Sequence, residues 1–224
     1  MNLLVLNGSP KEKSDTMRMT KSFVEGIVSE KECCVTIVDV IKKNIRPCTG
    51  CFRCWQNSDG KCVLDDDQNE ILSLYQKADV IVWSFPLYCY SMPSHLKAVL
   101  DRTISLLRLR MREIDGRVQH ETLVDFSKKR TMVLCGAGFP DWEGNFEGLR
   151  LQVKHCFGNL SAVFVPEAPL MNVPEAAPLS EPLLERFVLA GKEYAKTGTL
   201  SEKTIQALET PMMSKEEYLR NVNA

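Results

Sequence analysis

Short, wholly apolar segments alternate along this chain with longer stretches that carry apolar residues at helical spacing. The pattern predicts strands at residues 3–6, 34–40, 80–83, 131–135 and 162–165, and helices at 17–28, 69–76, 94–111, 146–157 and 183–195. Strands that are apolar on both faces and separated by helices are typical of a parallel sheet covered on both sides. We therefore expect an α/β protein built on one doubly wound sheet of five parallel strands.

Charge and composition limit the partners of such a protein. Lys and Arg number 28 and Asp and Glu number 29, so the net charge of −1 gives no electrostatic basis for binding nucleic acid or an anionic membrane. The first apolar run has no basic start and is cut short at Gly8, which indicates a strand rather than an export signal. We expect a cytoplasmic protein, whose nine cysteines serve metal, cluster or redox roles in preference to disulfides.

Three regions depart from the simple alternation. Residues 42–67 form a cysteine-bearing insertion after the second strand, and residues 115–129 form a polar connection that is a candidate lid or subunit contact. The tail at 201–224 contains an amphipathic stretch and is expected to be a helical appendage on a domain of residues 1–200. Arginines 102, 108, 110 and 112 are read at helical spacing and are expected to form a solvated face or a subunit contact.

The loop from Asn7 to Thr16 joins the first strand to the first helix. Gly8 allows a tight exit from the strand, and the free N–H groups of the helix start favour an anion. Since Gly8 is the only glycine here, a single phosphate fits better than a dinucleotide pyrophosphate. The hydroxyls that face such a phosphate come from Ser9, Ser14 and Thr16, with charge nearby from Lys11 and Lys13. The alternative is a helix that is merely capped by Ser14 or Asp15.

Two further loops follow the third and fourth strands. Residues 84–94 carry two prolines and two tyrosines, a stiff and flat-sided composition that suits a planar heteroaromatic ring. Residues 136–139 begin with three small side chains, which let a ligand approach the backbone closely. Each loop alone is also compatible with a purely structural role. Together, the three loops predict a ligand with a flat ring and a single phosphate.

These motifs resemble those of the NADPH-dependent FMN reductases and flavodoxin-like oxidoreductases. The G-S-P…S-x-T pattern of residues 8–16 resembles their phosphate loop. The P-L-Y…S-M-P-S-x-L-K…D-R pattern of residues 86–102 is similar to their flavin-ring loop and following helix. The resemblance covers about residues 1–200 and implies a flavodoxin-like sheet with strand order 2-1-3-4-5 and helices on both faces.

The resemblance also implies a function. FMN would be bound non-covalently, reduced by NAD(P)H and reoxidised by a small-molecule acceptor such as a quinone or a flavin. By position, Ser9, Lys11, Ser14 and Thr16 hold the phosphate; Pro86, Leu87, Tyr88, Ser91 and Met92 lie along the ring and ribityl chain; and Gly136, Ala137 and Gly138 line the other side. Hydride transfer is the chemistry of the cofactor, so no catalytic acid or base is named. A homodimer or homotetramer with the flavin near the subunit interface is implied as well.

The insertion carries Cys48, Cys51, Cys54 and Cys62 in the pattern C-x2-C-x2-C-x7-C. Such spacing is typical of a four-thiolate iron–sulfur cluster, and it resembles the motif of the iron–sulfur flavoproteins, a branch of the same fold. That resemblance implies a [4Fe–4S] cluster and an electron-transfer carrier with a ferredoxin-like donor. Three alternatives stay open: structural zinc with Cys51 shared by two C-x2-C pairs, a reversible dithiol, or an inert loop that shapes the pocket and the dimer contact.

Overall fold

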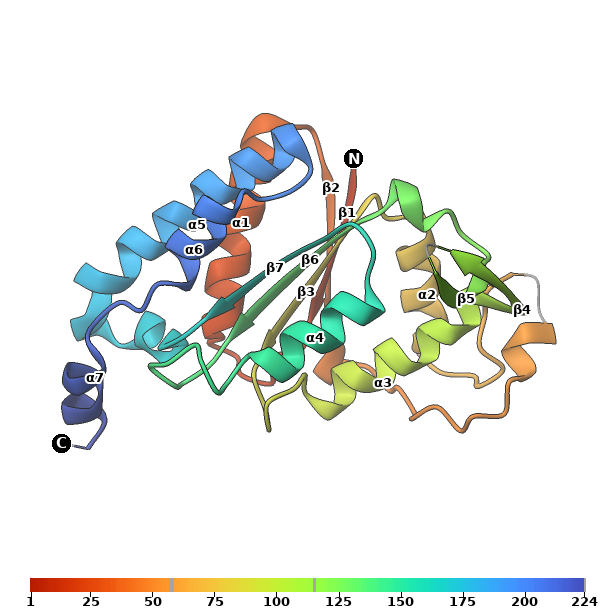
Figure 1. Cartoon of the computed structure of the whole chain (residues 1–224), viewed down its shortest axis with the longest axis horizontal. Helices are drawn as coiled ribbons and strands as arrows, with labels where there is room; N and C mark the ends of the chain where they lie inside the picture. The colour runs from red at the N-terminus through yellow and green to blue at the C-terminus, as the bar shows by residue number, and fades with distance from the viewer. Residues whose placement is uncertain (57–58, 115, 224) are drawn as a thin grey trace.

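Five parallel strands form the central sheet of the computed structural model, which describes residues 1–56, 59–114 and 116–223. The strands are β1 (Asn2–Asn7), β2 (Cys34–Asp39), β3 (Val80–Pro86), β6 (Arg130–Gly136) and β7 (Leu160–Val165). They lie in the order β2-β1-β3-β6-β7 (Figure 1). Counted along the chain as five strands, this is the order 2-1-3-4-5, so the prediction of a doubly wound flavodoxin-like sheet is confirmed.

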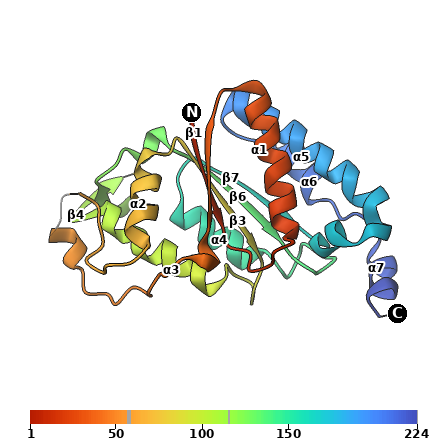
Figure 2. The ribbon, with the colours of Figure 1, turned by 180° about the vertical axis from the view of Figure 1, so that it is seen from behind.

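Helices cover both faces of this sheet because its strands are apolar on both sides. Along β1, Leu3 and Val5 pack into one core, and Leu4 and Leu6 pack into the other. The first core is covered by α1 (Asp15–Glu30) and α5 (Ala177–Thr197), and the second by α2 (Gln68–Lys77), α3 (Ser94–Arg102) and α4 (Glu147–Cys156) (Figures 1 and 2).

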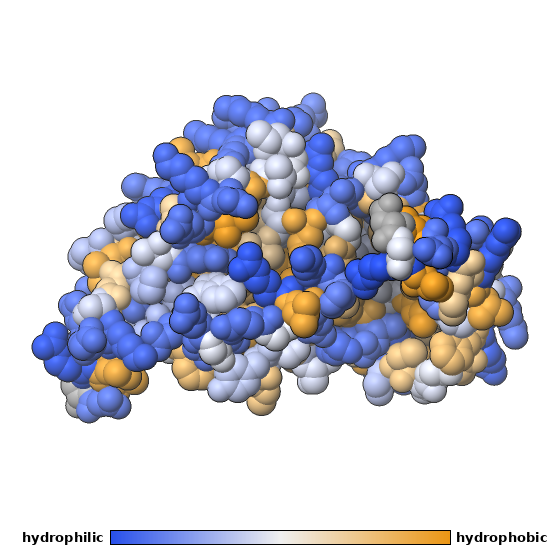
Figure 3. All heavy atoms as spheres, in the orientation of Figure 1, coloured by the Kyte–Doolittle hydropathy of each residue, from blue (hydrophilic) through white to orange (hydrophobic). Residues whose placement is uncertain are grey.

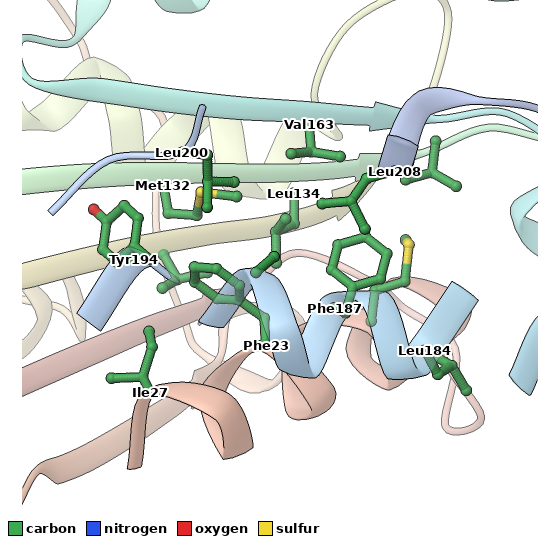
Figure 4. Close-up of a cluster of buried hydrophobic side chains, with 14 of the residues drawn as sticks. Phe23, Ile27, Met132, Leu134, Val163, Leu184, Phe187, Tyr194, Leu200 and Leu208 are labelled. Atoms are coloured by element: carbon green, nitrogen blue, oxygen red, sulfur yellow. The ribbon is translucent and has the colours of Figure 1, made fainter. Parts of the chain in front are cut away.

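Aromatic side chains fix α1 and α5 against the sheet. Phe23 of α1 and Phe187 of α5 are fully buried, and the ring of Phe23 meets that of Tyr194 edge-on at 5.4 Å. Figure 4 shows these rings facing Met132 and Leu134 of β6. Burying such rings contributes strongly to stability. The packing therefore holds α1, and with it the loop that precedes α1, in a fixed place relative to the strands.

The helix predicted at 94–111 is wrong beyond Arg102. The α3 helix ends there, and β4 (Leu107–Ile114) and β5 (Arg117–Thr122) form an antiparallel hairpin. Arginine alternates with an apolar residue from Leu107 to Arg112, which is the period of a strand rather than of a helix. Figure 3 shows hydrophobic atoms gathered over this hairpin and the neighbouring cysteine segment, where the exposed apolar residues include Phe52, Leu109, Met111 and Val118.

Two short helices, α6 (Glu202–Glu209) and α7 (Lys215–Val222), follow α5. α6 lies along β7, the edge strand, where the carboxylate of Glu209 accepts the N–H of Phe164 at 3.0 Å. The remaining helical turns are 3-10 helices: η1 (Val40–Lys42), η2 (Arg53–Gln56), η3 (Thr103–Leu106), η4 (Phe126–Lys128), η5 (Ala168–Asn172) and η6 (Pro174–Ala176). The predicted insertion, connection and tail contain residues 57–58, 115 and 224, which lie outside the described residues.

Candidate functional site

The loop between β1 and α1 starts at a glycine that the fold encloses tightly. Gly8 donates its N–H to the carbonyl of Ser84 at 2.8 Å, and Nε2 of His95 lies 2.9 Å from the carbonyl oxygen of Gly8. A Cβ on Gly8 would lie 2.7 Å from Leu96. A side chain at this position would force Leu96 to shift, so glycine is favoured where the strand leaves the sheet beside the start of α3. The contact of His95 was not predicted, because a histidine at a helix start gives no signal of the backbone that it faces.

Buried hydroxyls surround the N-terminus of α1. Ser14 is its N-cap, with Oγ accepting the N–H of Met17 at 3.1 Å, and this oxygen lies 2.9 Å from Oγ1 of Thr16. Oγ of Ser9, also buried, accepts the N–H of Lys11 at 3.3 Å. The cap predicted at Ser14 is thus present, and the same hydroxyls stand at the positive end of a 16-residue helix.

The ammonium group of Lys11 forms an ion pair with a carboxylate at the start of α1. Its Nζ is 3.1 Å from the carboxylate of Asp15, which also accepts a hydrogen bond from the side chain of Asn172. The side chain of Lys11 is 53% exposed, so the ion pair contributes little to stability. Lys11 remains a predicted phosphate ligand, and in that role it would exchange Asp15 for the phosphate.

The loop after β3 contains a tight turn with unusual backbone angles. Tyr88 and Ser91 exchange N–H···O hydrogen bonds of 2.9 and 3.0 Å, and the two residues between them, Cys89 and Tyr90, have φ of 47° and 60°. Left-handed angles are uncommon outside glycine and cluster at functional sites, where the surrounding fold maintains them. This turn is therefore a candidate binding element on geometric grounds as well as by composition.

The loops after β3 and β6 meet through exposed aromatic rings. The rings of Tyr90 and Phe139 are nearly parallel, 6.2 Å apart at an angle of 6°, although the two residues are 56% and 47% exposed. Leu87 donates its N–H to the carbonyl of Gly136 at 2.8 Å, which ties the same loops together at the backbone. The edge of the sheet thus presents flat apolar surface to solvent, of the kind that stacks on a planar ring.

Gly136 brings the loop after β6 close to the loop between β1 and α1. A Cβ on Gly136 would lie 2.6 Å from that of Ala168 and 3.3 Å from Cγ2 of Thr16. Ala137 is buried and donates to the carbonyl of Val165, whereas a side chain at Gly138 would meet only ordinary contacts. Gly136 is thus required by close packing, and Gly138 is the more open of the predicted small residues.

The predicted phosphate and ring residues therefore come to one edge of the sheet, beyond the carboxyl ends of β1, β3 and β6, which are neighbours. Two of the predicted ring residues do not have side chains free for a ligand. Met92 is buried, and Oγ of Ser91 donates to Gln152 of α4 at 3.1 Å.

The four cysteines of the insertion line a single small pocket of about 30 Å³, together with Arg102 and Ile104. Cys54 is buried, Cys62 is half-buried, and Cys48 and Cys51 are exposed. Burial, with the neighbouring thiols, raises the pKa of Cys54, whereas the backbone N–H of Arg53 and the side chain of Thr49 lower the pKa of Cys51. Within the described residues, no group of three or more His, Cys, Asp or Glu side chains is arranged to hold a metal ion. All nine cysteines are free thiols.

A buried ion pair anchors this pocket to α3. Nη1 of Arg102 lies 2.6 Å from Oδ2 of Asp66, and both side chains are fully buried. The same nitrogen donates to the carbonyl of Arg46 at 3.1 Å, and Nη2 donates to that of Leu64 at 3.4 Å. Burial opposes ionisation of Asp66, but hydrogen bonds from Arg102 and two backbone N–H groups leave its pKa below the ordinary value. The guanidinium thus holds both ends of the cysteine segment.

A model of the family described as flavodoxin-like fold matches residues 1–166. The chain therefore belongs to this family. An iron–sulfur flavoprotein from Methanocaldococcus jannaschii is 29% identical over 103 residues, which are 46% of this chain and 52% of the relative. Another, from Methanosarcina thermophila, is 29% identical over 108 residues, or 48% of this chain and 55% of the relative. The chain spans about half the length of the curated relatives it matches.

Solved structures share the fold at low sequence identity. An NAD(P)H:quinone oxidoreductase from Methanothermobacter marburgensis superposes with a TM-score of 0.62 at 18% identity, covering 86% of this chain and 95% of the other. An FMN-dependent NADH-azoreductase from Bacillus anthracis, solved in complex with FMN, gives 0.60 at 15% identity, covering 87% and 97%. No helix among the described residues combines the length and hydrophobicity needed to cross a membrane.

Proposed function

We propose that this chain is an FMN-dependent NAD(P)H oxidoreductase that passes electrons to a small acceptor such as a quinone or a flavin. The observation that carries the proposal is the meeting of three loops at one edge of the sheet. They place a buried hydroxyl group cluster at a helix N-terminus on one side and a stacked aromatic pair on the other. The names of the solved structures with this fold, a quinone oxidoreductase and an FMN-dependent azoreductase, support the same chemistry.

The phosphate end of FMN fits the start of α1. A phosphate dianion needs several donors, and the first turn of a helix offers N–H groups that have no partner within the helix. Ser9, Ser14 and Thr16 add hydroxyls that are already within hydrogen-bonding distance of one another or of the loop backbone. These residues would hold the phosphate without a second charged group, and Lys11 would add a cation from the rim.

The ring end fits the loops after β3 and β6. Pro86, Leu87 and Tyr88 would lie along the ring and ribityl chain, with Gly138 giving the backbone room on the opposite side. When bound, FMN would accept a hydride from NAD(P)H and return electrons to the acceptor. The residues of this chain would orient the ring: the exposed rings of Tyr90 and Phe139 would stack on one of its faces and leave the other to both substrates.

The experiment is a titration of the flavin-free protein with FMN and with riboflavin, followed by NADH and NADPH oxidation. We expect FMN to bind more tightly than riboflavin and to support turnover with a quinone. The proposal fails if FMN neither binds nor supports oxidation of either nucleotide. Equal affinity for FMN and riboflavin would refute the assignment of the phosphate loop.

A second function is favoured by the cysteine pocket. We propose that Cys48, Cys51, Cys54 and Cys62 hold a [4Fe–4S] cluster, so that the chain is an electron-transfer carrier supplied by a donor protein such as ferredoxin. The supporting observation is that all four line one pocket. Because the pocket is small and the thiols are not arranged around a metal position, the loop would rearrange around the cluster as it is assembled. The curated relatives named iron–sulfur flavoproteins support this chemistry.

Anaerobic reconstitution with ferrous iron and sulfide tests the cluster. We expect about four iron atoms and equal sulfide per chain in the wild type, and a marked loss in Cys54→Ser. Cys34→Ser is the matched control, because Cys34 is an exposed thiol on β2 outside the pocket. Absence of iron and sulfide, or retention of both by Cys54→Ser, would refute the proposal. Stoichiometric zinc without sulfide would instead support the structural alternative.

A further inference from the structure

The C-terminal segment ends beside the loops assigned to the flavin. In Figures 1 and 2, α7 stands apart from the two helix layers, beyond the carboxyl ends of β6 and β7. This is the same edge of the sheet that carries Gly138 and Phe139. The C-terminal segment is therefore close enough to contact the loops of the candidate flavin site.

One side chain attaches α7 to that edge. Tyr218 is the only buried residue among the eight of α7, and its hydroxyl donates to the carbonyl of Gly138 at 2.6 Å. At the start of α7, Nζ of Lys215 lies 2.6 Å from the carboxylate of Asp141, in the continuation of the same loop. A helix of this length is marginal without tertiary contacts. The position of α7 thus depends on contacts with the loop after β6.

A buried carboxylate attaches the chain just before α7. Glu167 is fully buried, and its Oε2 accepts the N–H groups of Met212 at 2.6 Å and Met213 at 3.2 Å. Its own N–H donates to the carbonyl of Phe139 at 2.9 Å. Its backbone is left-handed, with φ of 56°, and its Oε1 has no partner among the described residues. One residue thus joins the loops after β6 and β7 to the tail, at a cost in backbone strain.

We propose that the tail from Met212 to Tyr218 is a positioning element of the flavin site. Tyr218 acts through Gly138 and Glu167 acts through Phe139, and together they fix the loop that borders the ring. The inference rests on the proposed FMN function. It differs from a purely structural role for the tail because the contacts that attach it are polar and reach the site loop. Tyr218 donates to the backbone carbonyl of Gly138, and Lys215 pairs with the side chain of Asp141. The strained residue Glu167 bonds to the tail through its carboxylate and to Phe139 through its backbone N–H.

Tyr218→Phe tests the inference, because it keeps the ring and removes only the hydroxyl. Loss of one hydrogen bond to the loop should weaken FMN binding by roughly 2- to 10-fold and speed amide hydrogen exchange over residues 136–141. Tyr194→Phe is the matched control. Its hydroxyl is buried in α5 and has no hydrogen-bond partner in the described part of the chain, so its loss should leave both measurements unchanged.

A second pair of variants tests the carboxylate. Glu167→Gln keeps an oxygen that can accept from Met212, so FMN affinity should stay close to that of the wild type, whereas Glu167→Ala should weaken it. The inference is overturned if Tyr218→Phe matches Tyr194→Phe in both FMN affinity and hydrogen exchange. If the wild type binds no FMN, the proposed function fails. Faster exchange at 136–141 in Tyr218→Phe alone would then still establish the contact between tail and loop.

Discussion

Asp66→Ala is expected to lower the free energy of unfolding by about 3–5 kcal/mol, because it leaves the buried guanidinium of Arg102 without its counter-ion. The carboxylate also accepts the backbone N–H groups of Arg46 and Gln68, and these lose their acceptor in the same variant. Few surface substitutions cost a comparable amount. Chemical denaturation followed by circular dichroism measures the change.

Two comparisons isolate the charge at this position. Asp66→Asn keeps an oxygen acceptor and should cost less than Asp66→Ala. Asp101→Ala, one residue before Arg102, removes an exposed ion pair with Lys97 and should cost about 0.5 kcal/mol or less. If Asp66→Ala and Asp101→Ala destabilise the chain equally, the buried pair does not anchor the fold.

The pH dependence of stability gives a further check on Asp66. Its pKa in the folded chain lies below the ordinary value of 3.8, so its contribution to stability is present above that pH. The contribution is lost as the pH falls through the lower, folded-state pKa. Asp66→Ala should therefore differ most from the wild type near neutral pH, and the difference should shrink in acid.

The sheet was predictable because its strands are apolar on both faces. Residues such as Leu3 to Leu6 have no polar side to offer solvent, so only a position between two helix layers suits them. The helix prediction fails after Arg102 because it extends helical spacing over residues 107–111, where arginine at every second position from Arg108 to Arg112 fits a strand better. A short exposed hairpin buries little apolar surface, so the alternation of apolar and polar residues along its strands is a weak signal.

The loops of the site were predictable for a different reason. The signals are local: Gly8, the hydroxyls after it and the proline-rich turn can be interpreted from the sequence without knowing the tertiary contacts. His95, Glu167 and Tyr218 gave no such signal, because each acts on a backbone carbonyl or N–H far away in sequence. Contacts of this kind follow from the packing of the whole chain. The sequence therefore predicts which loops meet at this edge of the sheet, but not the residues that hold them in position.

Ser14→Ala is expected to weaken FMN binding by about 10- to 150-fold, the equivalent of one hydrogen bond to a charged group. Riboflavin, which lacks the phosphate, should bind the variant and the wild type equally. The residue is also the N-cap of α1, so stability should fall by about 1 kcal/mol. Isothermal titration with the two flavins separates the loss of a phosphate contact from the loss of the cap.

Ser201→Ala supplies the matched control for this substitution. Ser201 caps α6 through the N–H of Thr204, as Ser14 caps α1 through that of Met17, but it lies far from the three loops along the chain. Its loss should cost similar stability and leave FMN affinity unchanged. If both variants bind FMN as the wild type does, the phosphate is not held at α1. If Ser14→Ala weakens FMN and riboflavin alike, the serine acts only through the fold, because a phosphate ligand must distinguish the flavin that carries a phosphate from the one that does not.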